Sequence, residues 1–158
     1  MNKIVYNSLV FADNGTGEGK LTDISFEAKT SLAHDELSVN TLNFSVIYPS
    51  DESKPDDSIA KLPYGTICSY YRDDVLYSKY YLVSVTRKDR FTYQFEFQSS
   101  IGLLDDTNHY GGLYSGAYAS DIIADVIGGK IPYTIKQVFS KIKLYGWLPV
   151  ATRRANLQ

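Results

Sequence analysis

The sequence of 158 residues contains one cysteine, one tryptophan, two histidines and no long apolar run. A lone Cys68 cannot form an internal disulfide, so a secreted fold held by disulfides is excluded. No stretch approaches the ~20 apolar residues of a membrane-spanning helix. The opening MNKIVYNSLVF lacks the apolar core and cleavage site of a signal peptide. We therefore expect synthesis in the cytoplasm, with neither signal-peptide export nor membrane insertion.

The chain also lacks a large excess of positive or negative charge. Sixteen Lys and Arg face eighteen Asp and Glu, which leaves a net charge of -2. The positive residues are scattered among acidic and aromatic ones, and no basic stripe of the kind that binds nucleic acid is present. We expect no nucleic-acid partner.

Sequence motifs for cofactors and metals are missing. The loop GTGEGK lacks the glycine spacing of a phosphate-binding loop, and Leu21 follows it where such a loop has Ser or Thr. His34 and His109 lie far apart, and no pair of Cys or His residues has the spacing of a metal site. The sequence therefore predicts no cofactor and no metal.

Catalytic motifs are equally scarce. No G-x-S-x-G elbow occurs, and Cys68 lies within a strand pattern, where a buried, inert thiol is expected. Asp105, Asp106 and His109 combine carboxylates and an imidazole in one loop, and a turn capped by polar side chains explains them better than a catalytic site does. We expect no catalytic residues, and no enzyme within this chain.

Alternating apolar residues, in contrast, are abundant. Between residues 91 and 98, Phe91, Tyr93, Phe95 and Phe97 alternate with polar residues, the pattern of a half-buried strand. Similar patterns predict the strands 4–11, 21–28, 41–48, 66–71 and 76–85. The loop NGTGEGK suits a reversal between antiparallel strands, and PSDESKPDDS at 49–58 predicts a surface loop.

A helix is expected from Ser120, which can cap it, to Ile127, followed by Gly128 as a left-handed stop. The stretches 131–135 and 142–145 have strand-like composition, and HYGGLYSG before the helix predicts a glycine-aromatic loop. The final ATRRANLQ suits a short helix that we expect to continue in a longer parent protein. The predicted fold is α+β, mainly antiparallel β and barrel-like, with one or two short helices. We expect one domain over residues 1–135 and the start of a following segment at 136–158.

Tyrosine is the most unusual component, with fourteen residues. Its ring and hydroxyl suit both protein interfaces and platforms for sugar rings, although aromatic residues also simply favour strands. The candidate protein-contact residues are Tyr70, Tyr71, Tyr77, Tyr110, Tyr114, Tyr118 and Trp147.

Several motifs occur in the order found in one family. They are LPYGTICSYYRDDVLYSKYYLVSVTR, SSIGLLDDTNHYGGLYSGAYASDIIADVIGG, IPYTI and IKLYGWLPVATRRANLQ. Over about residues 42–158 the chain resembles the baseplate hub and tail-associated lysin proteins of phage tails. Asp74 departs from the pattern, since a turn glycine is more usual there.

The resemblance implies a hub-like β-barrel in a phage or prophage tail, which assembles with other tail and baseplate proteins, usually as a homotrimer. It implies a place in the virion tail, at the distal end of the tail tube. The alternatives are a carbohydrate-binding module for cell-surface glycans, or part of a tail-associated cell-wall hydrolase with its catalytic domain downstream.

Overall fold

The computed structural model describes residues 1–6, 8–28, 37–48 and 61–158. The chain forms two compact units, one of residues 1–29 and 39–99 and the other of residues 30–38 and 100–158. The loop expected at 49–58 and His34 lie outside the described residues. Residue 135, where the sequence placed a domain boundary, lies inside the second unit.

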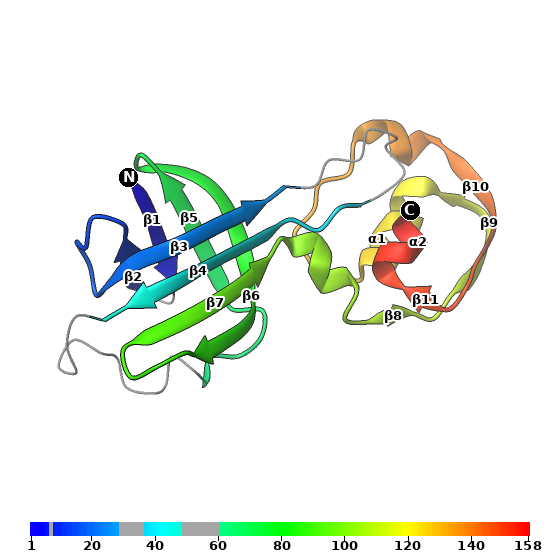
Figure 1. Ribbon diagram of the computed structural model, residues 1–158. Helices are drawn as coiled ribbons and strands as arrows, with labels where there is room; N and C mark the ends of the chain where they lie inside the picture. Colours follow the sequence, from blue (N-terminus) through cyan, green and yellow to red (C-terminus); the bar gives the residue numbers. More distant parts are fainter. Residues whose placement is uncertain (7, 29–36, 49–60) are drawn as a thin grey trace. The chain divides into compact units, whose positions relative to one another are not determined.

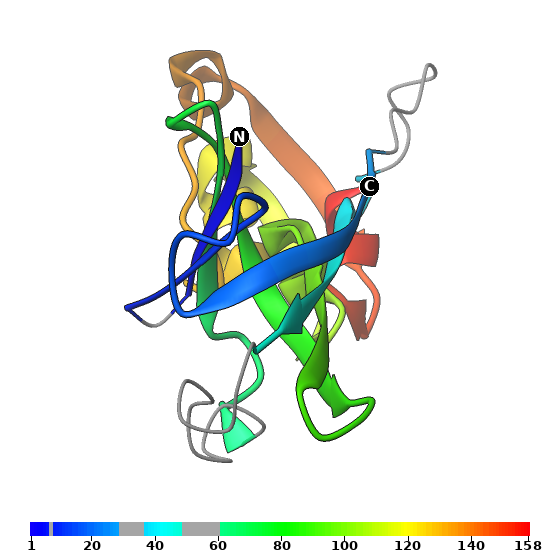
Figure 2. The ribbon, with the colours of Figure 1, turned by 60° about the vertical axis from the view of Figure 1, so that its left-hand side comes forward.

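The first unit is a closed barrel of seven strands, visible in Figures 1 and 2. Around the barrel the order is β1, β2, β3, β4, β7, β6, β5, and every neighbouring pair is antiparallel except β2 and β3. The strands are β1 (Asn2–Tyr6), β2 (Leu9–Ala12), β3 (Gly19–Glu27), β4 (Thr41–Ile47), β5 (Ile67–Arg72), β6 (Val75–Arg87) and β7 (Thr92–Gln98). The prediction of a barrel-like, mainly antiparallel β fold with short helices is confirmed, although the barrel is mixed.

The first strand of the sequence prediction was wrong. Two short strands, β1 and β2, replace it and pair antiparallel, with Tyr6 opposite Leu9 and a φ of 70° at Ser8. The loop after β2 does not reverse the chain into an antiparallel neighbour, because Phe11 and Gly19 pair in parallel. Gly19 is buried there against Val46, and a Cβ at Gly19 would lie 2.5 Å from the Val46 side chain. Only glycine therefore allows β3 to pass this close to β4.

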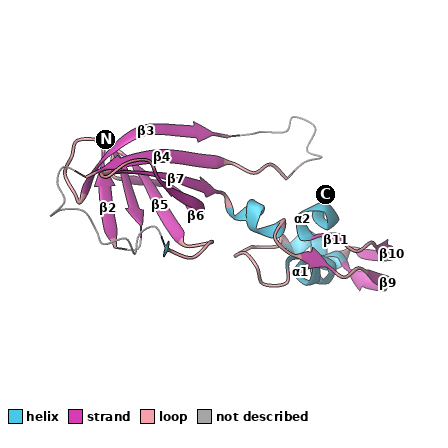
Figure 3. Cartoon of the chain, turned by 60° about the horizontal axis from the view of Figure 1, so that its bottom comes forward, coloured by secondary structure: helices cyan, strands magenta, loops and turns pink. Residues whose placement is uncertain are grey.

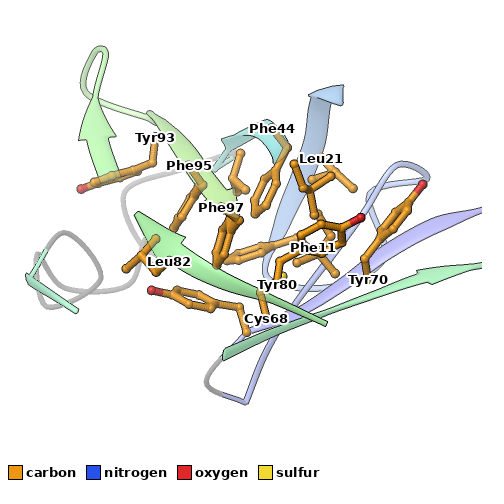
Figure 4. Close-up of a cluster of buried hydrophobic side chains, with 14 of the residues drawn as sticks. Phe11, Leu21, Phe44, Cys68, Tyr70, Tyr80, Leu82, Tyr93, Phe95 and Phe97 are labelled. Carbon is orange, nitrogen blue, oxygen red and sulfur yellow. The ribbon is translucent and has the colours of Figure 1, made fainter. Parts of the chain in front are cut away.

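The barrel interior is filled by aromatic rings (Figure 4). Phe44 stacks on Phe95 and Phe97 with centroids 5.0 and 5.5 Å apart, and Tyr6 meets the latter two edge-on. These residues alternate along their strands, so one face of β4 and of β7 is buried and the other carries polar side chains. Cys68 is fully buried among them, as expected.

The turn between β5 and β6 is formed by Asp73 and Asp74. Asp73 and Asp74 both have positive φ, 49° and 61°, as a two-residue turn of type I′ requires. The amino group of Met1 binds the Asp73 carboxylate, and Lys3 Nζ lies 2.7 Å from Asp74 Oδ1. Two aspartates therefore hold a backbone conformation that usually favours glycine, and ion pairs join the turn to β1.

The second unit combines short strands and helices, shown by type in Figure 3. Two two-stranded sheets pair β9 with β10 and β8 with β11. The elements are the 3₁₀ helices η2 (Ser100–Leu104) and η3 (Gln137–Lys141), the strands β8 (Asn108–His109), β9 (Gly112–Tyr118), β10 (Lys143–Leu148) and β11 (Ala151–Thr152), and the helices α1 (Ala119–Ile127) and α2 (Arg153–Leu157).

Two expectations for this unit need correction. The predicted glycine-aromatic loop contains β9, because its residues 112–118 pair with β10. Residues 131–135 form no strand. The expected helix at 120–127 is confirmed as α1, and Gly128 ends it in the left-handed conformation with a φ of 58°. Tyr118 occupies the N-cap position, however, and no side chain caps the helix.

The small apolar core of this unit is formed by Leu104, Ile127 and Ile131. Polar side chains of the RRANLQ segment join its elements. Arg153 donates to the carbonyl oxygens of Asp125 and Val126 at the end of α1, and its Nε donates to Thr107. Arg154 Nε lies 2.9 Å from a carboxylate oxygen of Asp105.

None of the described helices has the length and apolar character needed to cross a membrane.

Candidate functional site

One face of the β9–β10 ribbon is exposed along its whole length. Three cross-strand pairs form it: Tyr118 with Lys143, Ser115 with Tyr145, and Leu113 with Trp147. Directly opposite residues of an antiparallel pair point to the same side of the sheet. All six side chains are exposed, led by Leu113 at 83%, Tyr145 at 75% and Trp147 at 69%. We call these six residues the ribbon outer face.

A β-bulge at Gly116 brings Tyr118 to this face. The register shifts between the pairs Leu144–Ala117 and Tyr145–Ser115, which leaves Gly116 as the extra residue of β9. Its φ of 73° is a left-handed conformation that glycine adopts at no steric cost. If Gly116 instead occupied a regular strand position, Ala117 would be the next residue on the outer face and Tyr118 would point to the other side.

Gly116 also supports the Tyr145 ring. A Cβ at Gly116 would lie 3.2 Å from the Tyr145 hydroxyl oxygen and 3.4 Å from Cζ. The tyrosine side chain therefore crosses the backbone of β9, while three quarters of its surface stays exposed. Within the described residues, no other ring packs against Tyr145 or Trp147.

The opposite face of the ribbon lies toward the helices, which occupy one side of it in Figures 1 and 3. The Tyr114 hydroxyl donates to Asp125 Oδ2 of α1 at 2.6 Å. An open pocket of about 250 Å³ lies at the ribbon, with Tyr145 and Trp147 among its lining residues. The other lining residues are Tyr114, Ile122, Leu144, Gly146 and Leu148.

The barrel carries a different exposed surface, on the hairpin of β5 and β6. Ile67 pairs with Tyr81, and Tyr71 pairs with Leu76, all on the outside of the barrel. Ile67 is 51% exposed and Leu76 is 46% exposed, while the two tyrosines are partly exposed. We call these four residues the hairpin outer face.

The outer face of β4 and β7 is more polar than the hairpin outer face. Its cross-strand pairs include Asn43 with Glu96 and Ser45 with Gln94, which are polar on both strands. The outside of an antiparallel sheet normally carries such polar side chains. Apolar side chains on the hairpin therefore mark a surface suited to contact with another molecule.

The three candidate tyrosines of the hairpin have different environments. Tyr70 is only 8% exposed, and its hydroxyl donates to Asn2, so it belongs to the core. Tyr71 is partly exposed with the Lys3 ammonium 5.0 Å from its ring centroid. Tyr77 is 54% exposed and packs edge-on against Phe26. Only Tyr71 lies on the hairpin outer face.

The four candidates of the second unit also differ. Tyr118 and Trp147 lie on the ribbon outer face, and Tyr110 is 86% exposed just before β9. Tyr114 is partly buried and points to α1 instead. Its burial, followed by the hydrogen bond to Asp125, raises the pKa of the Tyr114 hydroxyl to about 12.

His109 joins β8 to the helices. Its Nε2 lies 3.3 Å from Asp125 Oδ2, and its Nδ1 accepts the backbone N–H of Gly111 at 3.2 Å. Because Nδ1 is an acceptor, the neutral imidazole carries its proton on Nε2 and donates it to Asp125. The hydrogen bonds from Tyr114 and then His109 hold the pKa of Asp125 below its usual value.

The carboxylates nearest to His109 in sequence are not its partner in the structure. Asp105 pairs with Arg154, and the ring contacts Asp125 instead. This corrects the grouping of Asp105, Asp106 and His109. A nucleophile would be needed to turn the His109–Asp125 pair into a hydrolytic site, and Cys68 lies in the other unit with its thiol pKa raised by burial.

Three or more His, Cys, Asp or Glu side chains do not come together as a metal site anywhere in the described parts of the chain. Searches with known protein families and with curated proteins found no match to this sequence.

Sequence reasoning missed several residues of these surfaces, namely Ile67, Leu76, Tyr81, Leu113, Ser115, Lys143 and Tyr145. Clusters of aromatic residues in a sequence do not show which face of a strand lies on the outside. In β5 the Cys68 side chain points into the barrel. Because side chains alternate along a strand, Ile67 and Tyr71 point outward.

Proposed function

We propose that this chain is a structural module of a phage or prophage tail, with a role like that of a baseplate hub. It joins other tail and baseplate proteins through the hairpin outer face and forms a homotrimer. It is made in the bacterial cytoplasm and then incorporated into the virion tail. The ordered sequence motifs supply the link to tails.

The observation that carries the assembly role is the pair of apolar cross-strand contacts outside the barrel. Ile67 with Tyr81 and Tyr71 with Leu76 expose apolar surface on either side of the outward-facing pair Ser69 with Lys79. The pairs outside β4 and β7 expose amides, hydroxyls and a carboxylate instead. Such a patch costs solubility unless a partner covers it. Aliphatic and tyrosine side chains on a rigid sheet suit a protein partner, because interface cores exclude charge and favour aromatic residues.

The test uses the complete chain with tail-tube and neighbouring baseplate proteins from the same virus. Leu76→Glu places a charge at the turn end of the hairpin outer face, and we expect co-purification to fall by at least about tenfold, since burying an unpaired charge is costly. Ser45→Glu is the matched control on the polar outside of β4, and its binding should equal that of the unmodified chain. Thermal unfolding of both variants verifies that the barrel is intact.

Two results would contradict the proposal. If the unmodified chain captures none of the tail proteins, the tail assignment fails. If Leu76→Glu binds as well as Ser45→Glu, the hairpin outer face is not the contact surface.

A further inference from the structure

The ribbon outer face differs chemically from the hairpin outer face. Three of its six side chains, Tyr118, Tyr145 and Trp147, combine a flat apolar ring with an O–H or N–H at the rim. The remaining three are Lys143, Ser115 and a single aliphatic residue, Leu113. Rings with polar rims suit a ligand that is itself flat and apolar on its faces and polar at its edge.

Lys143, Tyr145 and Trp147 form a linear stripe along β10. Alternate residues of a strand point to the same side and are separated by about 7 Å. The stripe therefore presents one cation and then two rings over about 14 Å. Lys143 also lies over the Tyr118 ring, with its Nζ 5.3 Å from the centroid. An extended ligand of several rings matches this length better than a compact one.

The basic residues around β10 indicate that the ligand is an anion. From Val126 to Gln158 the sequence has six basic residues and no Asp or Glu. Arg153 and Arg154 are engaged within the unit, whereas Lys141 and Lys143, at and just beyond the end of η3, are exposed. The side of the ribbon where β10 begins is thus complementary to an anion.

We propose that the ribbon outer face binds an acidic oligosaccharide, an extended chain of sugar rings that carries carboxylate or phosphate groups. Sugar rings lie on the exposed faces of Tyr145 and Trp147, and one acidic group pairs with Lys143. The inference does not depend on the proposed role in assembly, because it uses a different surface.

Two other partners fit less well. Single-stranded nucleic acid is held by a positively charged groove that follows the phosphates, and this face has one cation. An acidic peptide offers the same charge but no run of flat rings to lie on Tyr145 and Trp147.

The single tryptophan makes the test direct, because all tryptophan emission comes from Trp147. The full chain is titrated with hexagalacturonate, which carries carboxylates, with phosphorylated maltohexaose, and with neutral cellohexaose. We expect saturable changes in emission with at least one acidic sugar, and about threefold weaker binding of the neutral one, as expected for loss of one exposed ion pair. The two acidic probes distinguish carboxylate from phosphate.

Three variants localise the site. Tyr145→Ala keeps the fluorescent reporter and should weaken binding about tenfold, as for the loss of one stacked ring. Lys143→Gln should remove the preference for the acidic sugar and leave neutral binding unchanged. Tyr110→Ala is the control, since this exposed ring lies outside the stripe, and it should bind like the unmodified chain.

The proposal is overturned if no acidic sugar gives a saturable change, or if Tyr145→Ala binds as tightly as Tyr110→Ala. Equal or tighter binding of polyglutamate would indicate a site for an acidic peptide, and equal or tighter binding of a thymidine hexanucleotide would indicate a nucleic-acid site. Both results contradict the sugar assignment. None of these outcomes affects capture of tail proteins by the hairpin outer face, so the two proposals fail separately.

Discussion

The two units use aromatic side chains in opposite ways. In the barrel, rings of Tyr6, Phe44, Phe95 and Phe97 pack on one another away from solvent. In the second unit, Tyr110, Tyr145 and Trp147 are mostly exposed, and the described ring pairs all belong to the barrel. Similar residue types therefore supply stability in one unit and surface chemistry in the other.

The contrast extends to what holds each unit together. The barrel has a continuous apolar core, whereas the largest buried cluster among the described residues of the second unit is small, formed by Leu104, Ile127 and Ile131. Arg153, Arg154 and His109 connect the short elements of that unit by hydrogen bonds and ion pairs. A unit with so small a core depends more on each polar contact, which leaves its large side chains available for binding.

The largest effect is expected from the barrel core. Phe95 is fully buried and contacts the rings of Tyr6, Phe11, Phe44 and Phe97. Phe95→Ala should destabilise the barrel by about 3–5 kcal/mol, because it removes buried apolar surface and leaves a cavity. Denaturant unfolding measures the change. Leu113→Ala, at an exposed apolar position, is the control and should change stability by less than about 0.5 kcal/mol.

A smaller effect is expected from Arg153. Arg153→Met removes the hydrogen bonds to Thr107 and to the last carbonyls of α1, and should cost about 1–3 kcal/mol. Hydrogen exchange should show faster opening of α1 amides with little change in the barrel strands. Arg153→Lys should not restore the contacts, because an ammonium lacks the planar fork of donors. Equal acceleration in the barrel would show that the two units are not separately stabilised.

Much of the barrel could be predicted because its strands alternate cleanly. The pattern around Phe95 and Phe97 is that of β7 as the structure has it, and Gly128 ended α1 as expected. The hairpin of β1 and β2 was missed because only two polar residues, Asn7 and Ser8, interrupt the apolar stretch, and neither is Gly or Pro. The parallel pairing of β2 with β3 depends on contacts distant in sequence, which a local pattern does not contain.

The candidate surfaces were harder to predict than the strands. In the β5–β6 hairpin both faces are rich in apolar residues, so alternation alone does not say that Tyr70 is inside and Tyr71 outside. In β9 the glycines suggested a loop, although Gly116 is the bulge that brings Tyr118 outward. The partner of His109 is Asp125, which lies sixteen residues away on α1, whereas the nearer Asp105 forms an ion pair with Arg154.

Acid should weaken the second unit through Asp125. Its pKa is lowered, first by the hydrogen bond from Tyr114 and then by that from His109. A carboxyl with a lowered pKa in the folded state adds stability above its ordinary value of 3.8, and this stability is lost as pH falls through the folded value. The effect should stay below about 1 kcal/mol, because the side chain is 60% exposed.

The comparison is between the unmodified chain and Asp125→Asn. Their difference in free energy of unfolding should be largest near neutral pH and shrink below about pH 4. Thermal unfolding between about pH 3 and pH 7 measures it. A difference that stays constant with pH would show that the charge of Asp125 contributes nothing.

The smallest effects should have opposite signs in the two units, and two tyrosines provide the matched pair. The Tyr6 hydroxyl is buried without a hydrogen-bond partner among the described residues, and burial raises the pKa of Tyr6. Tyr6→Phe keeps the ring contacts and removes an unsatisfied polar atom, so it should leave the barrel unchanged or stabilise it by about 0.5 kcal/mol. Tyr114→Phe instead removes the hydrogen bond to Asp125 and should destabilise the second unit by about 0.5 kcal/mol. Hydrogen exchange resolved by unit measures both, and destabilisation of the barrel by Tyr6→Phe would mean that its hydroxyl is satisfied in solution.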